Sequence, residues 1–166
     1  MGNESDLEDW NAFYQRWSSR LFLFARQQTG SVAEAEDVLQ EAFVHVWTRR
    51  ERFPRIEPGI LFTQIRRVAI DRSRSRQRRK TREADFSAFH EPPLFAEAGS
   101  GDSGDLQAAL ETLPPEQQEV LVLKIWGEQT FESIGKTLDI SPNTAASRYR
   151  YGLERMRQFL SAESRS

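Results

Sequence analysis

The sequence predicts an all-α protein: a small helical bundle and a small helix-turn-helix domain, joined by a flexible acidic linker. Apolar residues recur at steps of three and four along most of the chain, and no stretch of useful length alternates in the manner of a strand. Around residues 85–104 this pattern gives way to Gly, Ser, Pro and acidic residues. We therefore expect domains at 1–84 and 105–166, with the linker at 85–104.

Three helices are predicted in the first domain. The first ends near Thr29 and Gly30, and its apolar face consists of Trp10, Phe13, Tyr14, Trp17, Leu21 and Phe24. The second begins at Ser31, because Glu34 follows three residues later and completes a capping box. The prolines of the segment RFPRIEPG end this helix, and the third helix starts after Pro58 and runs into an arginine-rich stretch.

The net charge of −2 conceals two opposed blocks. Nine basic residues and one acid lie between Arg66 and Arg82, whereas nine acids and no Lys or Arg lie between Glu83 and Glu119. The basic block has too many charges to be neutralised locally, and it suits the phosphates of a nucleic acid. The acidic block indicates a solvated or masking segment.

The second helix carries polar residues on the side away from its apolar stripe. Three acids align there at spacings of three and four, with a glutamine and a histidine nearby: Glu34, Asp37, Glu41, Gln40 and His45. No basic residue lies between Gly30 and Val46 to pair with these acids. Two interpretations are open, a solvated face and a docking surface for a basic partner.

Apolar side chains precede the basic block along the chain. Phe53, Ile60 and Phe62 can stack or wedge against unpaired bases beside a basic groove. For Phe62, a place in the hydrophobic core is an equal alternative.

The second domain is also predicted to be helical. Helical periodicity resumes at Asp105 and stops at two consecutive prolines, and another helix spans roughly Pro115 to Trp126. Two further helices are predicted at Thr130 to Leu138 and from Pro142 to about residue 160.

The last two helices form a predicted helix-turn-helix. Gly135 supplies the small residue at their crossing, Asp139 tolerates the left-handed conformation of the turn, and Ser141 followed by Pro142 is an N-cap before a proline at the first helical position. The outward face of the second helix carries short polar groups and arginines, as helices in the major groove do: Asn143, Thr144, Ser147, Arg148, Arg150 and Tyr151. The alternative is a plain helical hairpin with a solvated basic face.

Several function classes are disfavoured by composition. The chain has no cysteine and two distant histidines, so we expect no disulfide, metal site or cofactor. It has no glycine-rich phosphate loop and no isolated carboxylate pair in an apolar setting, so we expect neither an enzyme nor a small-molecule substrate. The acidic N-terminus is unlike a signal peptide, and the apolar runs are too short for a membrane span, so we expect a cytoplasmic protein without membrane insertion.

Together these segments resemble a bacterial RNA polymerase sigma factor of the sigma-70 family, extracytoplasmic-function (ECF) group. The family's region 2 signature resembles the segment AEDVLQEAFVHVW at 35–47, and the rest of region 2 resembles LFTQIRRVAIDRSRSRQRR at 61–79. Region 4 resembles the segment at 110–157, which contains the predicted helix-turn-helix. The match covers nearly the whole chain, and both regions occur in the family's order.

The resemblance implies a protein that binds core RNA polymerase and directs promoter-specific transcription initiation. Contacts to the β′ clamp helices would come from Asp37, Gln40 and Glu41. The −10 element would be engaged and opened by Phe53, Phe62, Arg66, Arg67, Arg72, Arg74, Arg76, Arg78 and Arg79. Region 4 would meet the β flap and read the −35 element with Asn143, Thr144, Ser147, Arg148 and Arg150. An anti-sigma factor is a further expected partner.

A conventional helix-turn-helix regulator, which binds a duplex operator on its own, is the main alternative. It explains the C-terminal half equally well. It gives no reason for a second basic block on a long helix in the N-terminal half.

Overall fold

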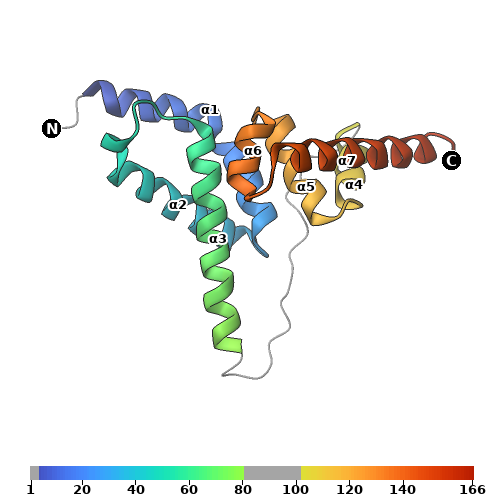
Figure 1. The fold of residues 1–166 in the computed structure, drawn as a ribbon, viewed down its shortest axis with the longest axis horizontal. Helices are drawn as coiled ribbons and strands as arrows, with labels where there is room; N and C mark the ends of the chain where they lie inside the picture. The colour runs from blue at the N-terminus through green and yellow to red at the C-terminus, as the bar shows by residue number, and fades with distance from the viewer. Residues whose placement is uncertain (1–3, 81–101) are drawn as a thin grey trace. The chain divides into compact units, whose positions relative to one another are not determined.

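The computed structural model describes residues 4–80 and 102–166, and the chain divides into two compact units, 1–90 and 91–166. In the first unit α1 (Glu4–Gln28), α2 (Val32–Thr48) and α3 (Pro58–Lys80) pack against one another, with the short 3₁₀ helix η1 (Arg50–Arg52) after α2 (Figure 1). Every regular element of the described residues is helical, as predicted. Most of the predicted linker lies outside the described residues.

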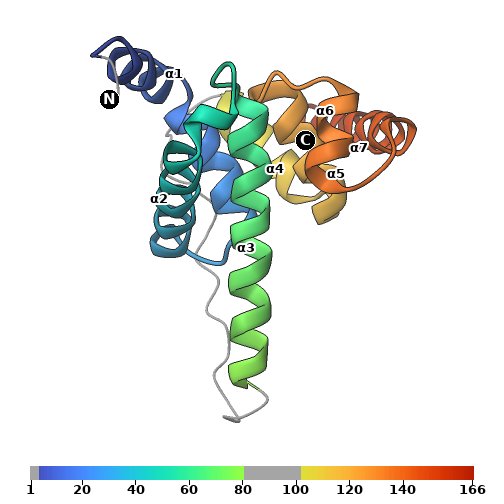
Figure 2. The same cartoon turned by 60° about the vertical axis from the view of Figure 1, so that its left-hand side comes forward.

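The core of the first unit is built where the apolar faces of the three helices meet. Its largest fully buried side chains are Leu21, Phe24, Val38, Val46, Leu61, Phe62 and Ile65. The apolar residues of α3 end at Ile70, and the rest of α3 extends past the ends of α1 and α2 (Figures 1 and 2). The C-terminal end of α3 therefore projects from the bundle, although Arg72 and Arg76 still reach acids of α2.

The start of α2 confirms the predicted capping box. Oγ of Ser31 accepts a hydrogen bond from the backbone N–H of Glu34 at 3.1 Å. The Glu34 carboxylate in turn accepts a hydrogen bond, at 3.3 Å, from the backbone N–H of Gly30, the residue before the N-cap. The first bond satisfies a backbone donor that the helix itself leaves unpaired, and the second reaches one residue beyond the N-cap N–H of the standard motif.

The second unit consists of α4 (Asp102–Glu111), α5 (Pro115–Leu121), the π-helical turn η3 (Val122–Trp126), α6 (Phe131–Leu138) and α7 (Pro142–Glu163) (Figure 1). The long helix α7 contacts α4, α5 and α6. Helix α4 begins at Asp102, three residues before the predicted start. The predicted helix at 115–126 changes to π geometry after Leu121, where the N–H of Gly127 reaches the carbonyl of Val122 at 3.0 Å.

Candidate nucleic-acid and polymerase interfaces

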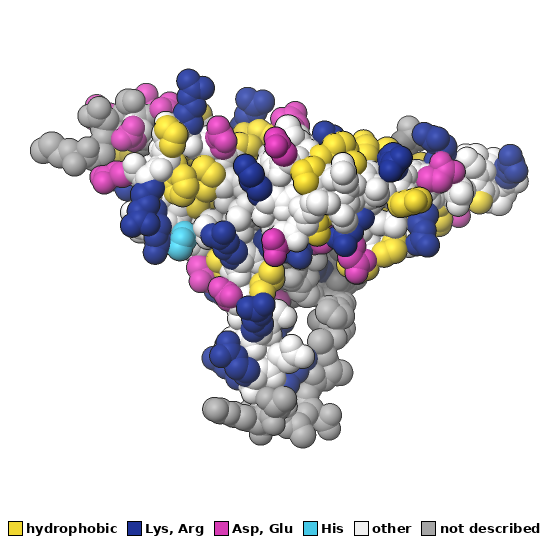
Figure 3. Space-filling view, viewed as in Figure 1, with side chains coloured by type: hydrophobic (Ala, Val, Ile, Leu, Met, Phe, Trp, Pro, Cys, Tyr) yellow, Lys and Arg dark blue, Asp and Glu magenta, His cyan; other side chains and the backbone are white. Residues whose placement is uncertain are grey.

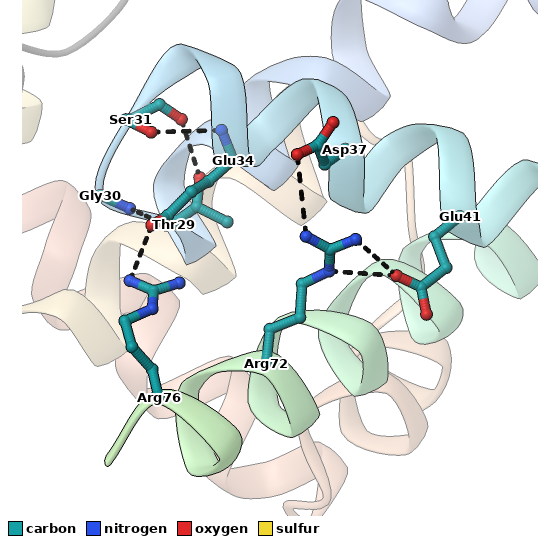
Figure 4. Close-up of polar contacts among 8 residues, drawn as sticks. All are labelled: Thr29, Gly30, Ser31, Glu34, Asp37, Glu41, Arg72 and Arg76. Atoms are coloured by element: carbon teal, nitrogen blue, oxygen red, sulfur yellow. Dashed lines mark hydrogen bonds and ion pairs between the residues drawn. The ribbon is translucent and has the colours of Figure 1, made fainter. Parts of the chain in front are cut away.

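The acids of α2 face arginines of α3 (Figure 4). Oε2 of Glu41 accepts two hydrogen bonds from Arg72, one from Nε at 3.0 Å and one from Nη2 at 2.8 Å. Nη1 of the same guanidinium lies 3.8 Å from Oδ2 of Asp37. One turn further along α3, Nη1 of Arg76 lies 2.8 Å from Oε1 of Glu34. Each acid of the predicted stripe therefore has a cationic partner within the domain.

This network corrects one expectation from the sequence. The acids of α2 were expected to have no basic residue with which to pair, yet Arg72 and Arg76 of the basic block pair with them; two ion-paired arginines out of nine basic residues still leave the block in excess of its local acids. The side chains of Asp37, Glu41 and Arg72 nevertheless remain 62%, 53% and 40% exposed. They form surface ion pairs, which are individually weak and which another charged molecule can reach.

The projecting half of α3 presents further positive charge to solvent. Figure 3 shows Lys and Arg side chains along this part of the helix. Five of the predicted DNA contacts on α3 are exposed, one before this half of the helix and four within it: Arg67, Arg74, Arg76, Arg78 and Arg79. Arg66 is half-buried instead, and its Nη1 donates to Oε1 of Gln28 on α1 at 3.2 Å. An exposed basic helix of this kind can approach the phosphates of a nucleic acid.

The two aromatic residues predicted near this helix have different surroundings. Phe53 is half-buried and lines an open groove of about 480 Å³ that also borders Trp10 and Phe13. Phe62 is fully buried, and its ring packs edge-on against Phe24 with 5.5 Å between the ring centroids. Because Phe62 has no exposed surface with which to meet a base, its assignment as a DNA contact is wrong and the core alternative is correct.

The turn of the helix-turn-helix has the predicted local structure. Asp139 adopts the left-handed conformation, with φ 57° and ψ 49°, and its N–H donates to the carbonyl of Gly135. The N–H of Ile140 donates to the same carbonyl at 3.0 Å. A Cβ atom built on Gly135 would lie 2.6 Å from the carbonyl oxygen of Ile140, so only glycine fits without a shift. The small residue predicted at this crossing is thus required by a backbone contact.

The start of α7 also follows the prediction. Oγ of Ser141 accepts a hydrogen bond from the N–H of Thr144 at 3.1 Å, and Pro142 occupies the first turn. The hydroxyl oxygens of Ser141 and Thr144 lie 2.9 Å apart. Asn143 and Arg150 are exposed, whereas the other predicted contacts are half-buried: Thr144, Ser147 and Arg148.

The segment before α6 contains supporting residues that the sequence did not indicate. Gln129 is 9% exposed, its Nε2 donates to the carbonyl of Gly127 at 2.8 Å, and its Oε1 accepts from Oγ of Ser133 at 2.6 Å. Glu128 takes a positive φ of 53°, which no local turn motif predicts. The Phe131 ring contacts the Tyr149 ring, with centroids 5.6 Å apart. The ring pair joins α6 to α7, whereas the Gln129 contacts tie the preceding segment to α6.

Within the residues described, no group of His, Cys, Asp and Glu could hold a metal ion. None of the helices over 4–80 and 102–166 combines the length and the apolar character that a membrane span requires.

Two family models match the chain in the predicted order. Sigma-70 region 2 matches residues 13–79, and Sigma-70 region 4 matches residues 103–156. RNA polymerase sigma factor CarQ of Myxococcus xanthus is 30% identical over 96% of this chain and 91% of its own length. The chain belongs to the sigma-70 family of RNA polymerase sigma factors.

Other relatives place this sigma factor in the ECF group. ECF RNA polymerase sigma factor SigE of Mycolicibacterium smegmatis is 27% identical over 98% of the chain, and the chain spans 66% of the length of that relative. ECF RNA polymerase sigma factor SigL of Mycobacterium tuberculosis is 29% identical over 88% of the chain and 85% of its own length. Both are similar to the chain across both of its regions.

A solved structure supports the fold of this sigma factor. Sigma factor RpoE from Bartonella quintana, determined in complex with the anti-sigma factor NepR, matches with a TM-score of 0.71 and 22% identity. The match covers 90% of this chain and 97% of that one. At this identity the similarity concerns the fold.

Proposed function

We propose that this sigma factor binds core RNA polymerase and directs promoter-specific transcription initiation, with region 2 engaging and opening the −10 element and region 4 reading the −35 element. The observation that carries the proposal is the presence, in one chain, of a bundle with a projecting basic helix followed by a helix-turn-helix, matched by the two sigma-70 models. An enzymatic activity, a small-molecule substrate and a cofactor have no place in this role.

The polymerase surface of region 2 is assigned to Asp37, Gln40 and Glu41 on α2. All three are exposed on one face, so a basic surface of the β′ clamp helices can reach them. Region 4 is assigned the contact to the β flap. An anti-sigma factor is the expected regulatory partner, by analogy with the solved RpoE complex.

The DNA surface of region 2 is assigned to Phe53 and the exposed basic residues of α3, with Arg66, Arg72 and Arg76 able to join once they leave their protein partners. In region 4 the exposed start of α7 is suited to the major groove. Its contacts are assigned to Asn143, Thr144, Ser147, Arg148 and Arg150. We place the protein in the cytoplasm, where polymerase and promoters are found.

Run-off transcription with purified core polymerase and genomic fragments tests the function. A promoter-specific product that depends on this chain is expected, and its absence with every fragment would contradict the proposal. The Arg148→Ala variant should lose initiation that depends on the −35 element while its binding to core polymerase stays unchanged. Equal loss from promoters with and without a −35 element would remove Arg148 from the reading surface.

The polymerase surface is tested by charge reversal. Asp37→Lys combined with Glu41→Lys should weaken binding to core polymerase, because both changes place positive charge on the docking face. Glu36→Lys is a suitable control, since Glu36 is exposed on the same helix but lies outside the ion-pair network. Binding that is weakened no further in the double variant than in the control would exclude this surface.

The alternative of a conventional regulator rests on α6 and α7 alone, and the region 2 and region 4 matches favour the sigma factor. Such a protein binds a duplex operator tightly without polymerase. The sigma factor should bind duplex promoter DNA well only in the presence of core enzyme, so a gel-shift comparison with and without polymerase separates the two.

A further inference from the structure

The guanidinium of Arg72 contacts the carboxylates of Asp37 and Glu41, to which we assign polymerase binding. It approaches Asp37 and Glu41 together, and two of its nitrogens share the single Oε2 atom of Glu41 (Figure 4). The arginine comes from α3, the helix assigned to DNA, and the acids come from α2, the helix assigned to polymerase. The two predicted binding surfaces are therefore joined by one set of ion pairs.

Both the acids and the arginine of this network can bind an external group instead of each other. A basic group of polymerase would compete with Arg72, and a DNA phosphate would compete with the acids. A basic group of the polymerase that binds Glu41 must share or displace the Arg72 guanidinium, since both use the carboxylate oxygens. A DNA phosphate that binds Arg72 must likewise compete with Asp37 and Glu41. Because all three side chains are 40% or more exposed, this exchange requires rotation of side chains and no movement of either helix.

We propose that the acidic face of α2 masks Arg72 from DNA in the free sigma factor, and that docking of polymerase on these acids releases Arg72 to contact DNA. The proposal rests on the polymerase surface assigned above. It makes the ion-pair network an autoinhibitory contact that the correct partner relieves.

The neighbouring ion pair of Glu34 and Arg76 limits which residues can be changed in a test. Arg76 pairs with Glu34, but Glu34 also caps α2, so a change at Glu34 would disturb the helix as well as the pair. Asp37 and Glu41 have no capping role. They are therefore the positions at which masking can be removed without loss of local structure.

The first test measures binding of the full free chain to a labelled single-stranded 20-mer of mixed sequence, by fluorescence anisotropy at several salt concentrations. Asp37→Asn combined with Glu41→Gln should bind about two- to fivefold more tightly than the control, as expected for release of weak surface pairs. The slope of log affinity against log salt should steepen by about 0.7, the value for one added phosphate contact on a single strand. The control is Glu36→Gln combined with Asp71→Asn, which removes equal charge from exposed positions of the same two helices.

Arg72 itself must account for the gain. Adding Arg72→Gln to the double variant should return binding to the level of the control. Equal affinity of the double variant and the control, or a gain that persists without Arg72, would overturn the masking.

The second test uses the reciprocity of coupled binding. Arg72→Gln leaves the acids unoccupied and should tighten binding of the full chain to core polymerase about two- to fivefold. Lys80→Gln, an equal loss of charge at an exposed site of α3, should not. Equal binding of these two variants would overturn the coupling, whereas failure of every variant and of the native chain to bind core would instead contradict the proposed function.

Discussion

Replacing Gly135 with alanine should lower the stability of the second unit, although alanine is the better helix former. In an open helix the exchange favours folding by about 0.5–1 kcal/mol. At Gly135 the new Cβ would lie 2.6 Å from the backbone oxygen of Ile140, and a backbone atom in a tight turn cannot rotate away. Overpacking of this kind costs about 1–3 kcal/mol. We expect a net loss of about 1–2 kcal/mol once the helix preference is subtracted.

Two other glycines of the same unit provide a matched series. A Cβ atom on Gly104 in α4 meets nothing within 4 Å, so Gly104→Ala should be neutral or stabilising by up to about 1 kcal/mol. A Cβ atom on Gly152 meets Cδ1 of Leu121 at 2.8 Å, which is the far end of a flexible side chain. Gly152→Ala should therefore fall between the other two. From most to least stable, the expected order of the variants is Gly104→Ala, Gly152→Ala and Gly135→Ala.

Urea and thermal unfolding of the full chain measure the series, and hydrogen exchange on peptides of α6 and α7 assigns each change to the second unit. For a unit of this size, 1 kcal/mol corresponds to a shift in Tm of about 4–8 °C. Gly135→Ala should also impair −35-dependent initiation, because α7 must move relative to α6. A Gly135→Ala variant as stable as Gly104→Ala would refute the reasoning from the backbone contact.

Three further predictions concern local interactions. Ser141→Ala should destabilise the chain by about 1 kcal/mol through loss of the N-cap of α7, whereas Ser161→Ala on the exposed end of the same helix should be nearly neutral in urea unfolding. Asp139→Gly should be more stable than Asp139→Ala by about 1 kcal/mol in thermal unfolding, because alanine pays more for the left-handed conformation. Burial, with a contribution from the Arg49 charge, lowers the pKa of His45 from 6.5. The unfolded chain therefore binds this proton more tightly, so the His45 contribution to stability is constant above about pH 6.5 and falls as the pH drops below it. His45→Gln should make pH-dependent unfolding less steep in this range.

The helices and turns could be predicted from the sequence because their causes are local. Ser31 and Ser141 cap helices through atoms three residues away, and Asp139 closes a turn through Gly135. Periodicity also carried a usable signal for Phe62, which precedes Ile65 and Ala69 by three and seven residues and so shares their buried face. Because Phe62 also lies just before the basic block, the sequence alone suited a contact to DNA equally well.

The α2–α3 network could not be predicted in the same way. Arg72 and Glu41 are 31 residues apart, and only the packing of the two helices brings them together. The sequence shows an acidic stripe and a basic block, each of which suits an external partner, and gives no indication that they meet. Likewise, neither the positive φ of Glu128 nor the hydrogen bond from Gln129 to the Gly127 carbonyl is specified by a pattern of residue types.

The two units solve different physical problems, and their contacts differ accordingly. A helix that reads base edges must be held within fractions of an ångström, and α6 and α7 are fixed by a backbone contact at Gly135 that admits no alternative side chain. The first unit must instead exchange partners between the free and the assembled states. Exposed ion pairs between α2 and α3 are suited to that exchange, because they orient Arg72 without binding it strongly. A buried salt bridge at the same place would hold the arginine too firmly for polymerase to release it.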